Sequence, residues 1–145
     1  MHDPNVQSES VVTIGIDYGG RRIGIAVSES GVLATPHAVI ANDGDVIGRI
    51  ETIGRQLDAG AYVVGLPRRA RTRDGEAKFR RFAEELRQRT CKPVHLWDET
   101  LSTVEAGERL RAQGRKRPRK DEDIDMYAAA IILQSWLDDQ AGRPS

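Results

Sequence analysis

The apolar residues of this chain follow two periods, one typical of strands and one typical of helices. Short runs rich in Val and Ile predict five strands, at residues 11–18, 23–28, 32–40, 61–66 and 94–98. Helical spacing predicts four helices: one capped by Asp43 or Asp45 and reaching about Leu57, then 76–89, about 102–113 and about 121–138. A three-strand antiparallel meander followed by alternating helices and two parallel strands is an α/β pattern with a mixed sheet.

The strand at 11–18 is expected in the centre of that sheet. The simplest arrangement places it between its hairpin partner, at 23–28, and the parallel strand at 61–66. Pro36 confines the strand at 32–40 to an edge or a bulge, because proline cannot donate a ladder hydrogen bond. Active sites of α/β proteins usually lie at the carboxyl ends of parallel strands, and this edge of the sheet is therefore the first place to look for chemistry.

Length and composition favour one globular domain. The chain has 145 residues, of which 39% are apolar and 30% charged. We expect a single domain over residues 11–138, with a disordered N-terminus at 1–10 and a frayed C-terminus at 139–145. No stretch approaches the roughly 20 apolar residues of a membrane span, and the N-terminus does not resemble a signal peptide. A lone Cys91 excludes an intrachain disulfide framework, which favours a cytoplasmic location and no membrane partner.

Two acidic positions follow predicted strands. Asp17 ends the first strand, where Gly19 and Gly24 would let a phosphate or metal approach the backbone closely, although a strand-end carboxylate can also cap a turn. Asp98 and Glu99 end the last strand and are adjacent, so that strand alternation sends them to opposite faces. One of the two should point into a common site, and parity alone does not choose between them.

Asp125 lies near the start of the last predicted helix. Its helical face continues through Ala128, Ala129, Ile132 and Trp136, and this apolar face should pack on the sheet and turn Asp125 inward. The two alanines would let the helix approach the sheet closely. Carboxylates held together repel one another, and a hard divalent cation such as Mg²⁺ or Mn²⁺ would neutralise them.

Basic residues gather in local runs, although 22 basic and 22 acidic residues give the chain a net charge of zero. Such runs bind phosphates even when the total charge cancels, and they also occur in solvated loops. One run spans residues 115–120. The candidates for contacts to substrate phosphates, which position a nucleic acid without reading its bases, are Arg21, Arg22, Arg68, Arg69, Arg71 and Arg73.

These motifs, in this order, resemble the YqgF (RuvX) family, described as Holliday-junction-resolvase-like proteins and pre-16S ribosomal RNA nucleases. The resemblance covers about residues 11–138 and rests on the segments 15–19, 23–27, 64–67, 98–106 and 125–134. It implies a ribonuclease H-like fold. It also implies that Asp17, Glu99 and Asp125 are the catalytic and metal-binding residues, which favours Glu99 over Asp98.

The resemblance implies a nuclease that uses Mg²⁺ or Mn²⁺ to hydrolyse phosphodiester bonds in processing the 5′ end of pre-16S rRNA. Asp17 would bridge two cations about 4 Å apart. The partner would be nucleic acid, either structured RNA or branched DNA, which the residues do not distinguish, and a homodimer is left open. One alternative is a Holliday-junction-resolvase-like DNA endonuclease in recombination and repair.

Two further alternatives come from other classes of protein. A nucleic-acid-binding module without cleavage is less favoured, because a pure binder gains nothing from burying repelling carboxylates near phosphate. The segment Gly-Ile-Asp-Tyr-Gly-Gly also resembles the phosphate loop of actin-like nucleotide-binding proteins, but that architecture needs two such domains, for which 145 residues are too few.

The chain departs from the family pattern at two places. Thr100 stands where the family usually has Arg after the Asp-Glu pair. The Asp-Gly pair that commonly follows Val-Gly-Leu-Pro is displaced to Asp74 and Gly75, behind the arginine-rich segment. Both departures affect a substrate preference inferred from relatives, and neither affects the predicted metal site.

Overall fold

A mixed five-stranded sheet forms the centre of the computed structural model, which describes residues 11–70, 72–101, 104–114 and 121–142. The strands are β1 (Thr13–Tyr18), β2 (Arg22–Ser28), β3 (Thr35–Ala41), β4 (Ala61–Leu66) and β5 (Val94–Asp98). Their order is β3-β2-β1-β4-β5, with antiparallel pairs among the first three and parallel pairs of β4 with β1 and β5. The predicted mixed sheet with the first strand at its centre is confirmed.

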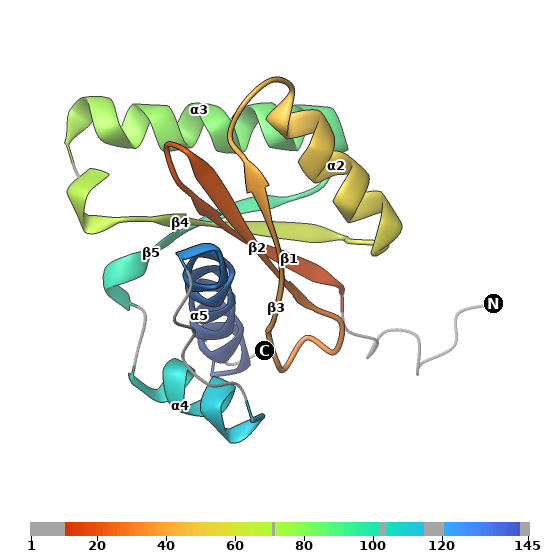
Figure 1. Cartoon of the computed structure of the whole chain (residues 1–145), viewed down its shortest axis with the longest axis vertical. Coiled ribbons are helices and arrows are strands. Elements are labelled where there is room, and N and C mark those ends of the chain that lie inside the picture. The colour runs from red at the N-terminus through yellow and green to blue at the C-terminus, as the bar shows by residue number, and fades with distance from the viewer. Residues whose placement is uncertain (1–10, 71, 102–103, 115–120, 143–145) are drawn as a thin grey trace.

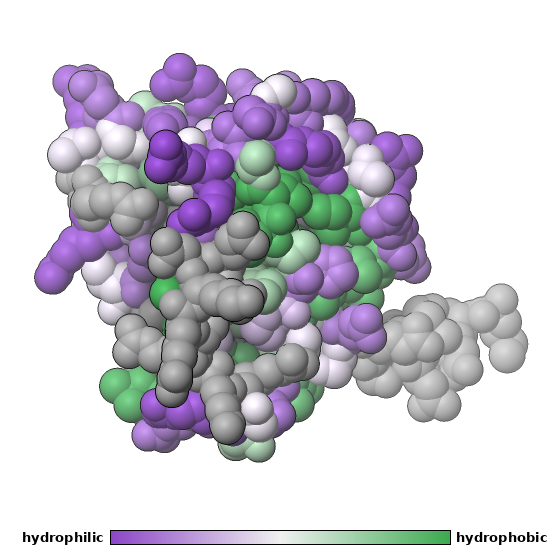
Figure 2. Space-filling model, viewed as in Figure 1, coloured by the Kyte–Doolittle hydropathy of each residue, from purple (hydrophilic) through white to green (hydrophobic). Residues whose placement is uncertain are grey.

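Helices cover both faces of this sheet (Figure 1). The helical segments are α2 (Val46–Gln56), η1 (Arg68–Ala70), α3 (Arg73–Thr90), η2 (Glu99–Leu101), α4 (Val104–Ala112) and α5 (Asp121–Ala141). α2 and α3 lie on one face, whereas α5 crosses the other and α4 packs on α5. In Figure 2, hydrophilic side chains cover the outer surface of α2 and α3, and apolar residues show in the middle of the view. None of the described helices is long and apolar enough to cross a membrane.

Local hydrogen bonds set the starts of two helices. α2 begins after Asp45, whose Oδ1 accepts a hydrogen bond from the Gly48 N–H at 3.1 Å, and Asp45 rather than Asp43 is therefore the cap. α3 begins earlier than the predicted residue 76, because the Thr72 hydroxyl oxygen accepts a hydrogen bond from the Gly75 N–H at 3.0 Å. The displaced Asp-Gly pair thus belongs to the first turn of α3.

Other sequence predictions meet the structure at the ends of elements. β3 is an edge strand, and its register with β2 shifts beside Pro36, as that proline predicts. α5 extends to Ala141, which puts residues 139–141 in the helix although we predicted that they would fray. The predicted disorder of residues 1–10 and the predicted start of a helix at about residue 102 lie outside the described residues.

Each face of the sheet has its own apolar core, because successive side chains of a strand point to opposite faces. Towards α2 and α3, Ile14, Ile16 and Ile25 are fully buried together with aromatic residues of α3. Towards α5, Ala26 and Val63 pack against alanines and leucines of that helix. The side chains on the α5 face of the sheet are smaller, which brings α5 closer to the strands.

Glycines on three neighbouring strands allow that close approach. A Cβ atom on Gly24 of β2 would lie 2.0 Å from the carbonyl oxygen of Asp125. On Gly15 of β1 it would lie 2.6 Å from the Cβ of Leu133, and on Gly65 of β4 it would lie 2.5 Å from the Cδ1 of Ile132. Real Cβ atoms do not come this close to other heavy atoms, so α5 occupies the space that these three side chains would need.

A buried glutamine joins α5 to the loop between β2 and β3. The Gln134 Oε1 accepts a hydrogen bond from the Ala34 N–H at 2.9 Å, and its Nε2 donates to the Val32 carbonyl at 2.8 Å and to Asp138 Oδ1 at 3.0 Å. Its side chain is fully buried. Buried backbone groups need such partners, and Gln134 therefore satisfies the N–H of the buried Ala34 while its bond to Val32 helps to fix the loop on α5.

Replacing Gln134 by Leu should lower the free energy of unfolding by about 2–4 kcal/mol, because it leaves the Ala34 N–H and the Val32 carbonyl without their partner. Urea denaturation measures this change. The same substitution at the exposed Gln140 of α5 is the control and should change stability by less than about 0.5 kcal/mol. Equal effects of the two substitutions would contradict a structural role for Gln134.

Candidate active site at the carboxyl end of the central strands

Asp17 lies near the end of β1, on the face that α5 covers. Gly15, two residues earlier, contacts α5, and alternate residues of a strand share a face. Asp17 pairs with Gly24 of β2, and the register that pairs Ile16 with Val64 puts Gly65 beside it on β4. The partly buried Asp17 is thus flanked on both neighbouring strands by residues without side chains.

Asp125 lies in the first part of α5 and reaches the same place over Gly24. Its backbone carbonyl packs directly on that glycine, which is the strand partner of Asp17. Ala129 is fully buried and Ala128 partly buried, in agreement with the predicted close packing of this face. One carboxylate oxygen of Asp125 accepts a hydrogen bond from Arg22 Nε at 2.6 Å.

Glu99 approaches from the other side of Asp17, over Gly65. It is the first residue of η2, and its Cγ lies 3.3 Å from where a Cβ on Gly65 would be. Asp98 instead closes a turn, because its Oδ1 accepts hydrogen bonds from the Thr100 N–H at 2.9 Å and from the Thr100 hydroxyl at 2.7 Å. Asp98 therefore stabilises a turn, whereas Glu99 packs on Gly65. Thr100, which stands where the family usually has Arg, is the hydrogen-bond partner of Asp98 in that turn.

A buried serine of α5 holds the chain on both sides of Glu99. The indole N–H of Trp97 donates to the Ser135 hydroxyl oxygen at 3.1 Å, and that hydroxyl donates to the Leu101 carbonyl at 2.9 Å. Ser135 is 4% exposed. We did not identify this residue from the sequence, where the only signal is a polar side chain within an otherwise apolar stretch of helix.

The backbone brings the three predicted acids to one edge of the sheet, but their side chains do not form a ready-made metal centre. Within the described ranges, no three His, Cys, Asp or Glu side chains are grouped so that they could hold an ion. One of the three carboxylates, that of Asp125, is bound instead by the guanidinium of Arg22. The donor set itself, three carboxylates, is the chemistry that Mg²⁺ and Mn²⁺ prefer.

Those predicted phosphate-contacting arginines that the structure describes lie around the same edge of the sheet. Arg21 is exposed, and Arg22 pairs with Asp125. Arg68 begins η1 directly after β4 and Pro67, and Arg73 begins α3; both are exposed. Arg71, the side chain of Arg69 and the basic run at 115–120 lie outside the described residues.

The fold is that of the ribonuclease H-like nucleases. RuvC from Thermus thermophilus, solved alone and in complex with a Holliday junction substrate, matches the structure with a TM-score of 0.62 in both cases. The matches cover 90% of this chain and 96% of RuvC, at 16% and 17% sequence identity. At that identity the likeness establishes the fold alone.

Sequence comparison identifies the family. The model described as "RuvX: Holliday junction resolvase" matches residues 11–139. A relative from Anaeromyxobacter sp. (strain Fw109-5) is 42% identical over 86% of this chain and 95% of its own length. Another relative, from Nocardioides sp. (strain ATCC BAA-499 / JS614), is 46% identical over 88% of this chain and 87% of its own length. Both are named "Putative pre-16S rRNA nuclease". The chain belongs to the RuvX family, and this membership places it among nucleases, as its sequence predicts.

Replacing Gly24 by Ala should move the start of α5 away from β2, because the new methyl group would overlap the Asp125 carbonyl. We expect the free energy of unfolding to fall by about 1–3 kcal/mol and amide exchange in the first turns of α5 to accelerate. Gly20 is the control, since a Cβ atom there meets no atom within 4 Å. If Gly24→Ala and Gly20→Ala behave alike, α5 does not depend on this close approach.

Proposed function

We propose that this protein is a divalent-metal-dependent nuclease that matures the 5′ end of pre-16S rRNA, and so acts in ribosome biogenesis in the cytoplasm. One observation carries the proposal: Asp125 and Glu99 lie over the two glycines that flank Asp17 on the neighbouring strands. The choice of substrate is supported by the names of relatives that are 39–46% identical over most of the chain.

Asp17, Glu99 and Asp125 would hold the metal, with Asp17 in the middle because both of its strand neighbours leave room. When bound, Mg²⁺ or Mn²⁺ supplies positive charge for the phosphate and lowers the pKa of a bound water. The protein holds its carboxylates on separate elements, a strand end, a 3₁₀ turn and a helix start. The hydrogen bonds of Ser135 fix the turn, and the glycine contacts fix the helix.

Arg22 has a double role in this proposal. Without metal, its guanidinium neutralises Asp125 and so reduces repulsion among the carboxylates. With metal, Asp125 would turn to the cation, and Arg22 would become available to a substrate phosphate, for which a guanidinium is equally suited. The Arg22 side chain is 43% exposed, so its pair with Asp125 is worth no more than about 1 kcal/mol, and a divalent cation can displace it.

The description of the family model favours a second candidate substrate, branched DNA. The three carboxylates would serve either substrate, because the proposed chemistry takes place at a phosphodiester bond. A cleavage assay separates the candidates by comparing pre-16S-like RNA, single-stranded RNA and four-way DNA junctions in Mg²⁺, Mn²⁺ or EDTA. We expect cleavage of the RNA precursor that EDTA abolishes; preferential cleavage of the junction would establish the DNA alternative instead.

Asp17→Asn and Glu99→Gln should each reduce cleavage by more than about a hundredfold. Loss of a residue that only hydrogen-bonds to a metal ligand already costs about 10–100-fold, and loss of a ligand itself should cost more. Asp98→Asn is the matched control: it changes the neighbouring carboxylate, which caps a turn, and should retain most activity. Nucleic-acid binding should persist in all three variants. Wild-type cleavage by Asp17→Asn at saturating metal would remove Asp17 from the site.

Arg22→Gln should bind Mn²⁺ about two- to fivefold more tightly than the parent protein, because the cation no longer competes with a guanidinium for Asp125. Titration calorimetry without nucleic acid measures this directly. Arg21→Gln, a change in the adjacent exposed residue, should leave Mn²⁺ affinity unchanged, and Asp125→Asn should weaken it. Unchanged or weaker Mn²⁺ binding by Arg22→Gln would rule out the competition.

A further inference from the structure

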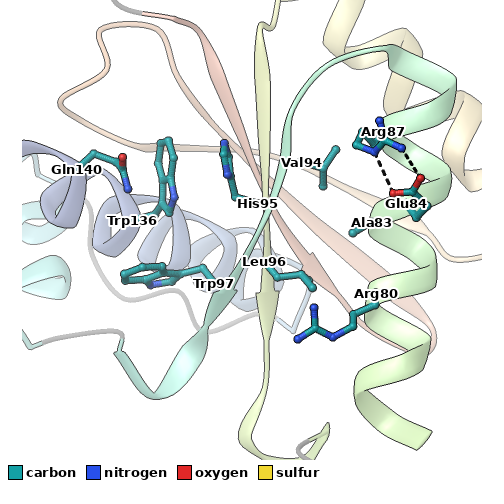
Figure 3. Close-up of a pocket in the computed structure, with 10 residues that line it drawn as sticks. All are labelled: Arg80, Ala83, Glu84, Arg87, Val94, His95, Leu96, Trp97, Trp136 and Gln140. Carbon is teal, nitrogen blue, oxygen red and sulfur yellow. Dashed lines mark hydrogen bonds and ion pairs between the residues drawn. The ribbon is translucent and has the colours of Figure 1, made fainter. Parts of the chain in front are cut away.

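A groove of about 830 Å³ runs along the edge of the sheet beside β5. β5 is the last strand in the sheet order, and the groove is bounded by α3 on one side and by α5 on the other (Figure 3). Its lining residues are Arg80, Ala83, Glu84, Arg87, Val94, His95, Leu96, Trp97, Trp136 and Gln140. The volume lies within the range of about 300–1,000 Å³ that is usual for ligand sites.

One wall of the groove is aromatic. The rings of His95 and Trp136 stack with their centroids 5.2 Å apart and an angle of 29° between their planes. Trp97 lies two positions further along β5, on the same face, and its indole N–H is held by Ser135. His95 is exposed and both tryptophans are partly buried, which leaves ring surface accessible from the groove.

The opposite wall, on α3, is charged. Arg87 Nε donates to Glu84 Oε2 at 2.9 Å, and a second contact between the two side chains completes a paired arrangement. Arg80 lines the groove without a carboxylate partner in the described part of the chain. The wall therefore carries a net positive charge, supplied by Arg80.

The groove lies next to the candidate active site along the chain, because its lining reaches Trp97 of β5. Trp97 precedes Glu99 by two residues, and the hydrogen bonds of Ser135 join Trp97 to Leu101 on the far side of Glu99. A nucleic-acid strand whose phosphate lies at the carboxylates could thus continue directly along β5. Aromatic rings that stack on bases, together with cations that contact phosphates, are the features that bind single strands without sequence preference.

We propose that this groove binds a single-stranded RNA segment flanking the phosphate to be cleaved. Bases would stack on the rings of His95, Trp97 and Trp136, and Arg80 would contact a phosphate. This inference rests on the proposed function, since it assigns more of the same substrate. Addition of a protein strand to the free edge of β5 is the competing use of the groove. It is less suited to a wall with three charged side chains, which a packed peptide would have to desolvate.

Both tryptophans of the chain line the groove, so tryptophan fluorescence reports on changes in the groove. The experiment titrates a short uridine oligonucleotide into the full-length Asp17→Asn protein in EDTA, where cleavage cannot interfere. We expect saturable quenching of tryptophan fluorescence, with the same midpoint as binding measured by anisotropy of a labelled oligonucleotide.

Substitutions locate the binding more closely. His95→Ala and Trp136→Ala should each weaken oligonucleotide binding by about five- to a hundredfold, the range expected for loss of one stacked base. His95 is exposed, so its variant keeps the test valid if Trp136→Ala unfolds. Arg80→Gln should reduce the slope of log affinity against log salt by about 0.7. Arg81→Gln, an exposed neighbour on α3 outside the groove lining, should leave that slope unchanged.

Three results would overturn the groove assignment: binding by anisotropy without quenching, equal effects of Arg80→Gln and Arg81→Gln, or quenching that follows self-association of the protein rather than added oligonucleotide. The last would indicate a second copy on the edge of β5. A different result would count against the proposed function alone, namely quenching that persists while the parent protein, with metal, cleaves none of the nucleic-acid substrates.

Discussion

The close approach of α5 to the sheet is the constraint on which the site depends. Without side chains at Gly15, Gly24 and Gly65, the helix rests on strand backbone, with the carbonyl of Asp125 directly over β2. The two glycines that flank Asp17 are also the ones over which the Asp125 carbonyl and the Glu99 side chain lie. In the proposed function, packing and chemistry would therefore both require glycine at these two positions.

Charge balance is the second constraint on the site. Three carboxylates near one strand end repel one another, and the structure offsets this locally through the ion pair of Arg22 with Asp125. Asp98, a fourth carboxylate, is directed into a turn with Thr100. In the proposed function, the same arginine would also bind a substrate phosphate, which would link the binding of metal to the binding of substrate.

The sequence predicted the elements well because their signals are local. β4 and β5 have the predicted bounds, and the simplest arrangement of the predicted elements placed Asp17 on a central strand. Choices that depend on three-dimensional contacts were not accessible in this way. The hydrogen bonds of the structure identify Asp45 rather than Asp43 as the helix cap. They also show that Asp98, and not Glu99, stabilises the turn after β5. The hydrogen bonds of Ser135 and Gln134 and the groove along β5 join segments distant in sequence, and no periodicity reports such contacts.

The central claim is that the three acids around Gly24 and Gly65 hold a divalent cation. Diffraction from crystals soaked in Mn²⁺, recorded near the manganese absorption edge, tests it most directly because the anomalous signal locates the ion itself. The account predicts manganese between the carboxylates of Asp17, Glu99 and Asp125, with Arg22 no longer bound to Asp125. Ordered manganese bound elsewhere, with the Arg22–Asp125 pair intact, would contradict it.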